Sequence, residues 1–192
     1  GVVFAASSVD YASLSTLGDS RNSPHLSIVA TNQSPTPVYE YAAAVAGVVA
    51  YYGNIDPARP FQTLQLTGVL PPAIADNFSL QERNVLLYDG ISVTKAIAGG
   101  VVTLDRLITT YKTNGAGASD TSYLDVTTML TLLYLRFTFR NRIMTRYPRH
   151  KLTNDTTRLG AGQAAITPKI GKGEAINWFR DMETLGLVEN FE

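Results

Sequence analysis

The stretch ISVTKAI-AGG-VVTLDRLI, residues 91–108, decides the fold class of this chain. Two apolar runs, 91–97 and 101–108, flank the pair Gly99-Gly100. Because glycine supplies the positive φ angles that a tight turn requires, the pattern predicts a β-hairpin that ends at Arg106. A hairpin introduces an antiparallel pair, which argues against a purely parallel sheet.

Strands and helices alternate on the N-terminal side of the hairpin. Residues 2–6 and 26–30 are short apolar runs, predicted to be two buried strands joined by a loop. Residues 34–37, Ser-Pro-Thr-Pro, indicate a helix start at which a hydroxyl can cap the free amides. The helix is expected from about Pro37 to Tyr52, with Gly53-Asn54 ending it. Residues 61–66 are predicted to form another strand.

Two further helix starts carry capping signals. Ser79-Leu80-Gln81-Glu82 fits a capping box, which makes Glu82 a helix-start residue in preference to a catalytic acid. Thr167-Pro168 begins a C-terminal helix, and Gly186 is placed to end it. Between them, residues 123–147 carry too many apolar side chains for one narrow stripe, so a long helix buried on more than one side is expected.

These elements predict an α/β fold with a mixed β-sheet packed by helices. At 192 residues, one core and a single domain over 1–192 are expected. The polar segment 153–163 contains Gly160 and Gly162 and is predicted to be a flexible loop.

The bulk composition excludes several function classes. Charged residues make up 17% of the chain, against about a quarter in an average globular protein, and the net charge is zero. A zero net charge favours neither nucleic acid nor an anionic membrane as a partner. Cysteine is absent, which excludes disulfides and thiol chemistry, and the apolar run 42–52 is too short to span a membrane.

The sequence contains no recognisable motif for catalysis or cofactor binding. Only His25 and His150 could serve a Ser-His-Asp triad, and the chain has no Gly-x-Ser-x-Gly elbow. Zinc would need more histidine or cysteine, and the carboxylates lack the spacing of a calcium loop. The Gly115-Ala116-Gly117 segment lacks the lysine and spacing of a phosphate-binding loop. We therefore expect no catalytic, metal or cofactor site.

Charge is segregated along the chain although its total cancels. All but one of the charged residues from 136 to 158 are basic, whereas residues 1–90 and the segment after Gly173 are mainly acidic. Three interpretations remain open: a solvated helix face, a nucleic-acid-binding strip, or a contact with the acidic surface of another copy. The candidate subunit-contact residues are Arg136, Arg140, Arg142, Arg146 and Arg149.

Four segments together are specific, although each alone is weak. They are ERNVLLYDGI (82–91), DRLITTY (105–111), DTSYLD (120–125) and YPRHKL (147–152). In combination they resemble the tail sheath protein of Mu-like contractile-tailed bacteriophages. A weaker likeness extends from residues 18–24 to residues 186–191, so the resemblance covers nearly the whole chain.

The resemblance implies a mechanical polymer subunit with a subtilisin-like core. Sheath subunits of this family stack around a tail tube and contract to drive the tube through the host envelope. The implied partners are other sheath copies, the tail tube protein, the baseplate and the tail terminator, and the implied location is the virion, after assembly in the host cytoplasm.

Family members are longer, and the chain begins with Gly1, so a fragment without the N-terminal region and C-terminal arm is expected. Without arms, we expect a monomer in dilute solution with an unpaired sheet edge. The alternative is an α/β enzyme or ligand-binding domain with a site at the strand ends, near Asp105-Arg106 or the Gly115 loop.

Overall fold

The computed structural model describes residues 1–191 and divides into two compact units, Gly1–Leu130 and Thr131–Glu192. The first unit contains β1 (Val3–Ser7), α1 (Tyr11–Asp19), β2 (Leu26–Ala30), α2 (Val38–Ile55), the short 3-10 helix η1 (Ile74–Asp76), α3 (Leu80–Tyr88), β3 (Ile91–Ile97) and β4 (Val101–Arg106). The helix α4 (Val126–Arg146) begins in the first unit, and the second unit continues with β5 (Lys151–Leu152), β6 (Ala165–Ile166) and α5 (Pro168–Thr184). The single domain expected over 1–192 stays a prediction.

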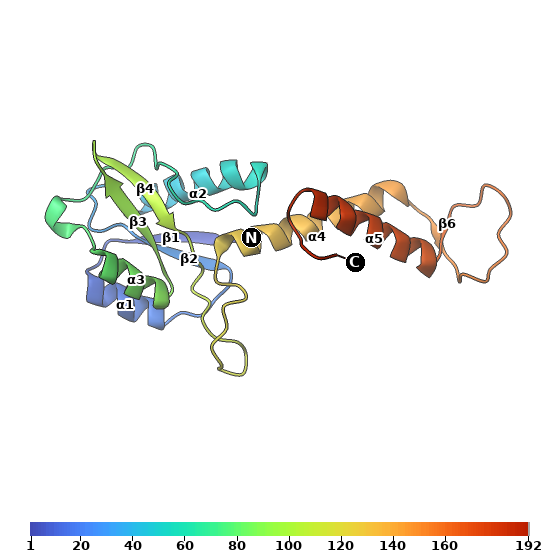
Figure 1. Cartoon of the computed structure of the whole chain (residues 1–192), viewed down its shortest axis with the longest axis horizontal. Helices are drawn as coiled ribbons and strands as arrows, with labels where there is room; N and C mark the ends of the chain where they lie inside the picture. The colour runs from blue at the N-terminus through green and yellow to red at the C-terminus, as the bar shows by residue number, and fades with distance from the viewer. Residues whose placement is uncertain (192) are drawn as a thin grey trace. The chain divides into compact units, whose positions relative to one another are not determined.

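A four-stranded mixed sheet in the order β1-β2-β3-β4 organises the first unit (Figure 1). β1, β2 and β3 pair in parallel, and β3 pairs antiparallel with β4. Gly99 and Gly100 both have positive φ in the turn between β3 and β4. The predicted hairpin and the mixed α/β class are confirmed.

Helices cover both faces of this sheet (Figure 1). On one face, Leu14 of α1 and Leu86 of α3 pack against Ile28 and Ile91. On the other face, α2 contributes Tyr41, Val45 and Val49 to a cluster that includes Val29, Val102 and Val126. The Tyr41 hydroxyl lies 2.7 Å from the Thr94 hydroxyl, which ties α2 to β3. Burial raises the pKa of Tyr41 to about 12.

Three details predicted for residues 1–55 differ from the structure. The connection between β1 and β2 is not a plain loop, because it contains the helix α1, capped by the Asp10 carboxylate, which accepts from Ser13 N–H at 3.1 Å. Ser34 does not cap α2: the hydroxyl donates to Leu70 O at 2.6 Å, and Pro37 is the N-cap with no side-chain bond. The helix also continues past Gly53-Asn54 to Ile55.

Residues 61–66 do not form the predicted strand. Thr63 has a φ of 71°, which interrupts the extended backbone. The segment still lies along β4, since Thr63 N donates to Leu104 O at 2.8 Å and Leu66 N donates to Val102 O at 2.9 Å. It therefore covers the outer edge of β4 irregularly.

The capping predictions for α3 and α5 are confirmed. Ser79 and Glu82 form both bonds of the capping box, and hydrogen bonds from the Ser79 backbone and hydroxyl lower the pKa of Glu82. Thr167 caps α5. At its other end, Gly186 has a φ of 70° while Gly186 N donates to Glu183 O and Leu187 N donates to Met182 O, the double bond pattern of a Schellman motif.

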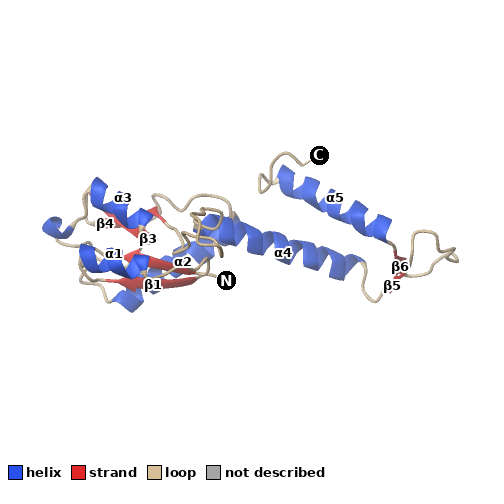
Figure 2. Cartoon of the chain, turned by 90° about the horizontal axis from the view of Figure 1, so that it is seen from below, coloured by secondary structure: helices blue, strands red, loops and turns tan. Residues whose placement is uncertain are grey.

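The long helix forms at the expected place but is not buried along its length. In α4 only Val126 and Met129 are buried, and both lie in the first unit. Further along, Phe137 and Met144 are 64% and 63% exposed. The sequence pattern overestimated burial because the second unit offers α4 only one partner helix, α5, shown beside it in Figure 2. Within residues 1–191, no helix has the length and apolar character needed to cross a membrane.

The close approach of α1 to the C-terminal end of α3 predicts a sharp difference between two helical glycines. A Cβ on Gly18 would collide with the Asp89 carbonyl oxygen, whereas a Cβ on Gly47 of α2 meets nothing within 4 Å. Gly18→Ala should lower the free energy of unfolding by about 1–3 kcal/mol. Gly47→Ala should raise it by about 0.4–1 kcal/mol, because alanine restricts the unfolded chain.

Urea unfolding of the two variants, followed by circular dichroism, measures both changes on the same scale. Equal stability of the two variants would show that α1 and α3 can separate without cost.

Candidate assembly surfaces

The candidate arginines occupy two different sides of α4. At 3.6 residues per turn, Arg136 and Arg140 share one side, and Arg142 and Arg146 share another, about a third of a turn away. Arg136 and Arg140 are exposed, and neither takes part in an ion pair within residues 1–191. The candidate arginines of α4 therefore lie on two surfaces with different surroundings.

Arg142 and Arg146 face α5. Arg142 Nε donates to Glu174 Oε2 at 2.9 Å, and another nitrogen of the same guanidinium pairs with Asp181. Arg146 donates to Glu174 Oε1 at 2.9 Å. The Arg142 side chain is only 15% exposed, so the guanidinium forms its ion pairs inside the second unit.

Glu174 is the centre of this charged cluster. Besides the two arginines, the Tyr147 hydroxyl donates to Glu174 Oε1 at 2.9 Å. The hydrogen bond from Arg142, followed by those from Tyr147 and Arg146, lowers the pKa of Glu174 to about 2. The hydrogen bond that the Tyr147 hydroxyl donates to Glu174 also raises the pKa of Tyr147. The carboxylate therefore stays ionised in the folded unit well below its usual range.

An aromatic group completes the contact between the two helices. The Trp178 ring centroid lies 5.1 Å from that of Phe139 and 4.7 Å from that of Phe179. Trp178 Nε1 donates to the Thr138 hydroxyl at 3.3 Å. Phe191 stacks on Phe179 at 4.8 Å, which holds the segment after α5 against the helix.

Arg149 follows α4 in a constrained turn. Its φ is 56°, in the left-handed region that few residues other than glycine adopt. The side chain is exposed and makes no ion pair within residues 1–191. Next to it, the His150 ring packs edge-on against Tyr147, with centroids 5.3 Å apart.

The two-stranded sheet of the second unit is small and open. β5 and β6 pair in parallel through only two residues each, Lys151 with Ala165 and Leu152 with Ile166. Leu152 is 87% exposed. The segment 153–163 joins these strands with no helix or strand of its own, and its flexibility stays a prediction. Such a short pair leaves backbone donors and acceptors free on its outer sides.

The strand-end region proposed for an enzyme site has its charged groups paired with each other. A hollow of about 410 Å³ is lined by Asp105, Arg106 and Asp125, among others. Arg106 binds the Asp125 carboxylate through two nitrogens at 3.1 and 3.2 Å, and Arg83 pairs with Asp105 at 3.1 Å. These pairs fix β4 to the start of α4 and to α3.

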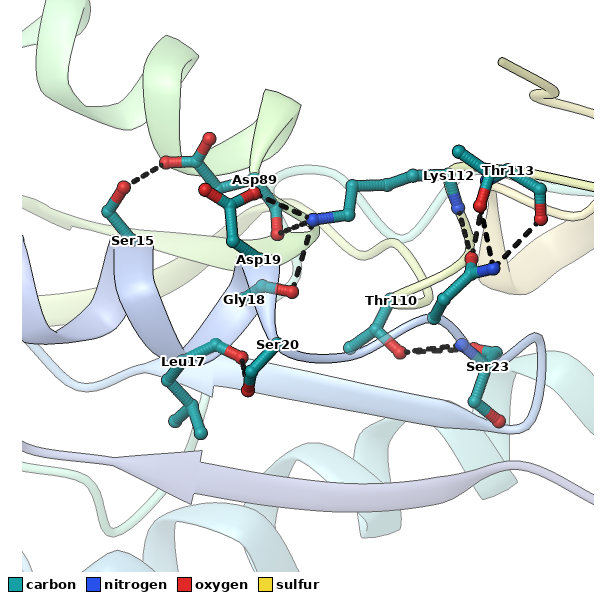
Figure 3. Close-up of polar contacts among 11 residues, drawn as sticks. Ser15, Leu17, Gly18, Asp19, Ser20, Ser23, Asp89, Thr110, Lys112 and Thr113 are labelled. Atoms are coloured by element: carbon teal, nitrogen blue, oxygen red, sulfur yellow. Dashed lines mark hydrogen bonds and ion pairs between the residues drawn. The ribbon is translucent and has the colours of Figure 1, made fainter. Parts of the chain in front are cut away.

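Hydrogen bonds also hold the residues that lead into the loop around Gly115. Lys112 Nζ donates to Gly18 O, Asp89 O and Asp19 Oδ1, so one ammonium group caps the ends of α1 and α3 (Figure 3). The Asn22 amide donates to Thr113 O at 2.9 Å and accepts from Lys112 N at 2.8 Å. The tip, residues 115–118, is exposed.

The two histidines lie far from the geometry of a catalytic triad. His25 Nδ1 lies 3.1 Å from Gly1 O, and His150 Nδ1 lies 3.1 Å from Pro148 O. Neither ring contacts a serine hydroxyl or a carboxylate through a hydrogen bond within residues 1–191. In the same part of the chain, no group of three or more His, Cys, Asp or Glu side chains is arranged to hold a metal ion.

Sequence reasoning missed the acidic partners of the arginines. The sequence places Glu174 and Asp181 in an acidic C-terminal segment without pairing them with particular arginines. Their spacing of seven residues places both on one side of α5, and both carboxylates pair with Arg142 of α4. The available signal was a pair of acidic residues on one side of the helix that follows the basic helix.

The pKa of Glu174 predicts acid sensitivity of the α4–α5 contact. The folded pKa is about 2 and the reference value is 4.5, so the cluster contributes its full stability above pH 4.5 and loses it as the pH falls toward 2. Trp178, the only tryptophan, is 6% exposed and should report this loss by fluorescence between those pH values.

Glu174→Gln removes the titrating group and leaves two arginines facing a neutral side chain. The variant should be less stable at pH 7, and its remaining acid transition should no longer depend on this carboxyl. An unchanged fluorescence titration in the variant would show that other carboxylates carry the acid response.

Two family models match the chain. The model described as phage tail sheath protein central domain matches residues 2–110, and the model described as phage tail sheath C-terminal domain matches residues 118–192. Their boundary lies close to the start of α4, near the division of the structure at Leu130.

A curated relative is similar over the whole chain. It is the Mu-like prophage FluMu tail sheath protein of Haemophilus influenzae, 46% identical over 192 residues. The chain spans 39% of the length of that relative.

A solved structure shares the fold. It is one chain of the cryo-EM structure of the anti-feeding prophage (AFP) baseplate, with a TM-score of 0.64 at 13% sequence identity. The match covers 96% of this chain and 45% of that chain. The two family models and the 46% identity show that this chain belongs to the phage tail sheath protein family.

Proposed function

We propose that this chain is part of a sheath subunit that polymerises around a tail tube and contracts to drive the tube through a host envelope. The observation that carries the proposal is the 46% identity, over the whole chain, to a protein named as a tail sheath protein. The role is structural, as in the family, and requires no catalysis, cofactor or metal. The protein would be a virion component, made in the host cytoplasm before assembly.

The division into two compact units supports this mechanical role. Contraction of a helical polymer rearranges subunits, and such rearrangements proceed by movement of rigid bodies whose links persist. Each unit has its own packed interior: the sheet with its helices in the first, and the Trp178 and Glu174 contacts in the second. The partners would be other sheath copies, the tube protein, the baseplate and the tail terminator, with no nucleic acid or membrane contact by this chain.

The exposed arginines are proposed as subunit contacts. Arg136, Arg140 and Arg149 carry charge that is unpaired within residues 1–191, and acidic residues dominate positions 1–90 of any neighbouring copy. Opposite charges guide orientation and register during association. Arg142 and Arg146 are proposed to contribute indirectly, since they lie on the other side of α4 and their ion pairs to α5 would hold the helix that carries this surface.

The open β5–β6 pair is proposed as a second linkage point. A segment from another subunit could add to either outer side through backbone hydrogen bonds. The 192-residue chain, separated from the remaining length of a sheath subunit, is expected to stay monomeric in dilute solution. Sedimentation or light scattering measures this directly, and helical polymers of the isolated chain would contradict it.

Electron microscopy of the full-length parent protein tests the proposed function. Tubular polymers are expected, and a compact small oligomer would contradict a sheath role. In the same assay, Arg136→Glu with Arg140→Glu should reduce the number and length of tubes, because the reversed charges repel an acidic partner.

The matched control is Lys172→Glu with Arg180→Glu, which makes the same charge change at exposed positions of α5. It should leave tube length close to that of the unmodified protein. Normal tubes from the Arg136/Arg140 variant would remove these residues from the contact and leave the sheath role standing.

A further inference from the structure

β1 is an edge strand with free backbone groups. Within residues 1–191 it pairs only with β2. Val3 N donates to His25 O at 2.8 Å and Ser7 O accepts from Thr31 N at 3.0 Å, so these alternate residues face β2. In a parallel ladder the residues between them turn their backbone groups the other way. Phe4 and Ala6 therefore present N–H and C=O groups to the open edge.

An apolar groove runs beside this edge. It has a volume of about 490 Å³, and none of its lining residues is charged. One wall is β1, with Phe4, Ala5 and Ala6, and the other is the N-terminal half of α2, with Ala42, Ala43 and Ala46. The alanines leave room for the side chains of an incoming segment. Tyr39, which also lines the groove, is 70% exposed, and Val3 beside the groove is 63% exposed.

These features together select one kind of occupant. The free amides and carbonyls of Phe4 and Ala6 require an extended backbone as a partner. The uncharged walls require that partner to carry apolar side chains on the side that faces α2. A small molecule or a helix would fill the groove without satisfying the strand edge.

The remaining length of the protein supplies such a segment. The chain spans 39% of the tail sheath relative, so a full-length subunit holds much more polypeptide than the structure contains. We propose that an extended, apolar segment of the full-length polypeptide, outside residues 1–192, adds to the free edge of β1 in the same molecule and packs on the alanines of α2.

Continuity with the core favours addition within one molecule. Phe4, Ala6 and Ala44 already pack against the cluster of Val29, Tyr41 and Val45. The groove is therefore continuous with the hydrophobic core of the first unit. A covalently connected segment also meets the edge at a high effective concentration. The inference rests on membership in a longer sheath subunit and is independent of polymerisation.

Hydrogen exchange of the Phe4 and Ala6 amides tests the inference. In the full-length protein, held monomeric at low concentration, both amides should exchange at least about tenfold more slowly than in the 192-residue chain, because the added strand protects them. The amide of buried Ile28 should be protected in both proteins, because β2 has a paired strand on each side. Equal exchange of Phe4 and Ala6 in the two proteins would overturn the proposal.

Dilution separates the two possible sources of protection. Protection from the same molecule is independent of protein concentration, whereas protection that disappears on dilution would come from a second copy and would overturn the proposal as stated. Tube formation by the full-length protein is scored separately, so loss of this inference leaves the proposed sheath role intact.

A pair of alanine substitutions on α2 gives a second test. Ala43 is exposed in the 192-residue chain and lines the groove, whereas Ala50 is exposed on the same helix outside it. Ala43→Arg should leave the melting temperature of the 192-residue chain unchanged, and in the full-length protein it should lower that temperature and remove the protection of Phe4 and Ala6. Ala50→Arg should do neither. Equal behaviour of the two variants in the full-length protein would contradict a strand in this groove.

Discussion

The burial of β2 on both faces is the constraint on which the first unit depends. Ile28 and Ala30 enter the cluster under α1 and α3, while Val29 between them enters the cluster under α2. A strand whose alternate side chains are both buried must have helices on both sides of its sheet. The close contact at Gly18 and the Lys112 bonds join the ends of α1 and α3 on one face of the sheet, and the Tyr41–Thr94 bond joins α2 to β3 on the other.

The second unit depends on a different kind of contact. Its helices meet through long side chains: the Arg142–Glu174 and Arg146–Glu174 pairs and the aromatic group around Trp178. Removing one partner from such a charged cluster leaves the others desolvated without compensation, so the cluster specifies how α4 and α5 meet. The exposed arginines on the other side of α4 are consequently presented on a helix that does not need them for its own packing.

Much of the fold could be predicted from local signals. The Gly99-Gly100 turn, the Ser79–Glu82 capping box and the Thr167-Pro168 start each have a short-range physical cause, and the structure places each as expected. The helix α1 was missed because its sequence is rich in serine and threonine, although Asp10 ahead of it was a capping signal. Residues 61–66 were misassigned because a positive φ at Thr63 is not visible in an apolar pattern.

The candidate surface was predictable only as a charge pattern. The sequence showed where basic residues gather, but it could not show which of them α5 neutralises, since that depends on pairing between helices about thirty residues apart. It also indicated a sheet edge without naming the strand. Both failures have the same origin, because long-range contacts decide which chemically similar groups remain free.

The free edge of β1 affects how the isolated chain behaves in concentrated solution. Residues 2–7 carry no charge and no proline, the features with which natural edge strands discourage unwanted pairing. A strand of this kind is a template for any extended segment, including one from a partly unfolded copy, so concentrated solutions should be prone to aggregation that starts at the N-terminal strand. A charged residue at an outward position of β1 would act as a gatekeeper against it.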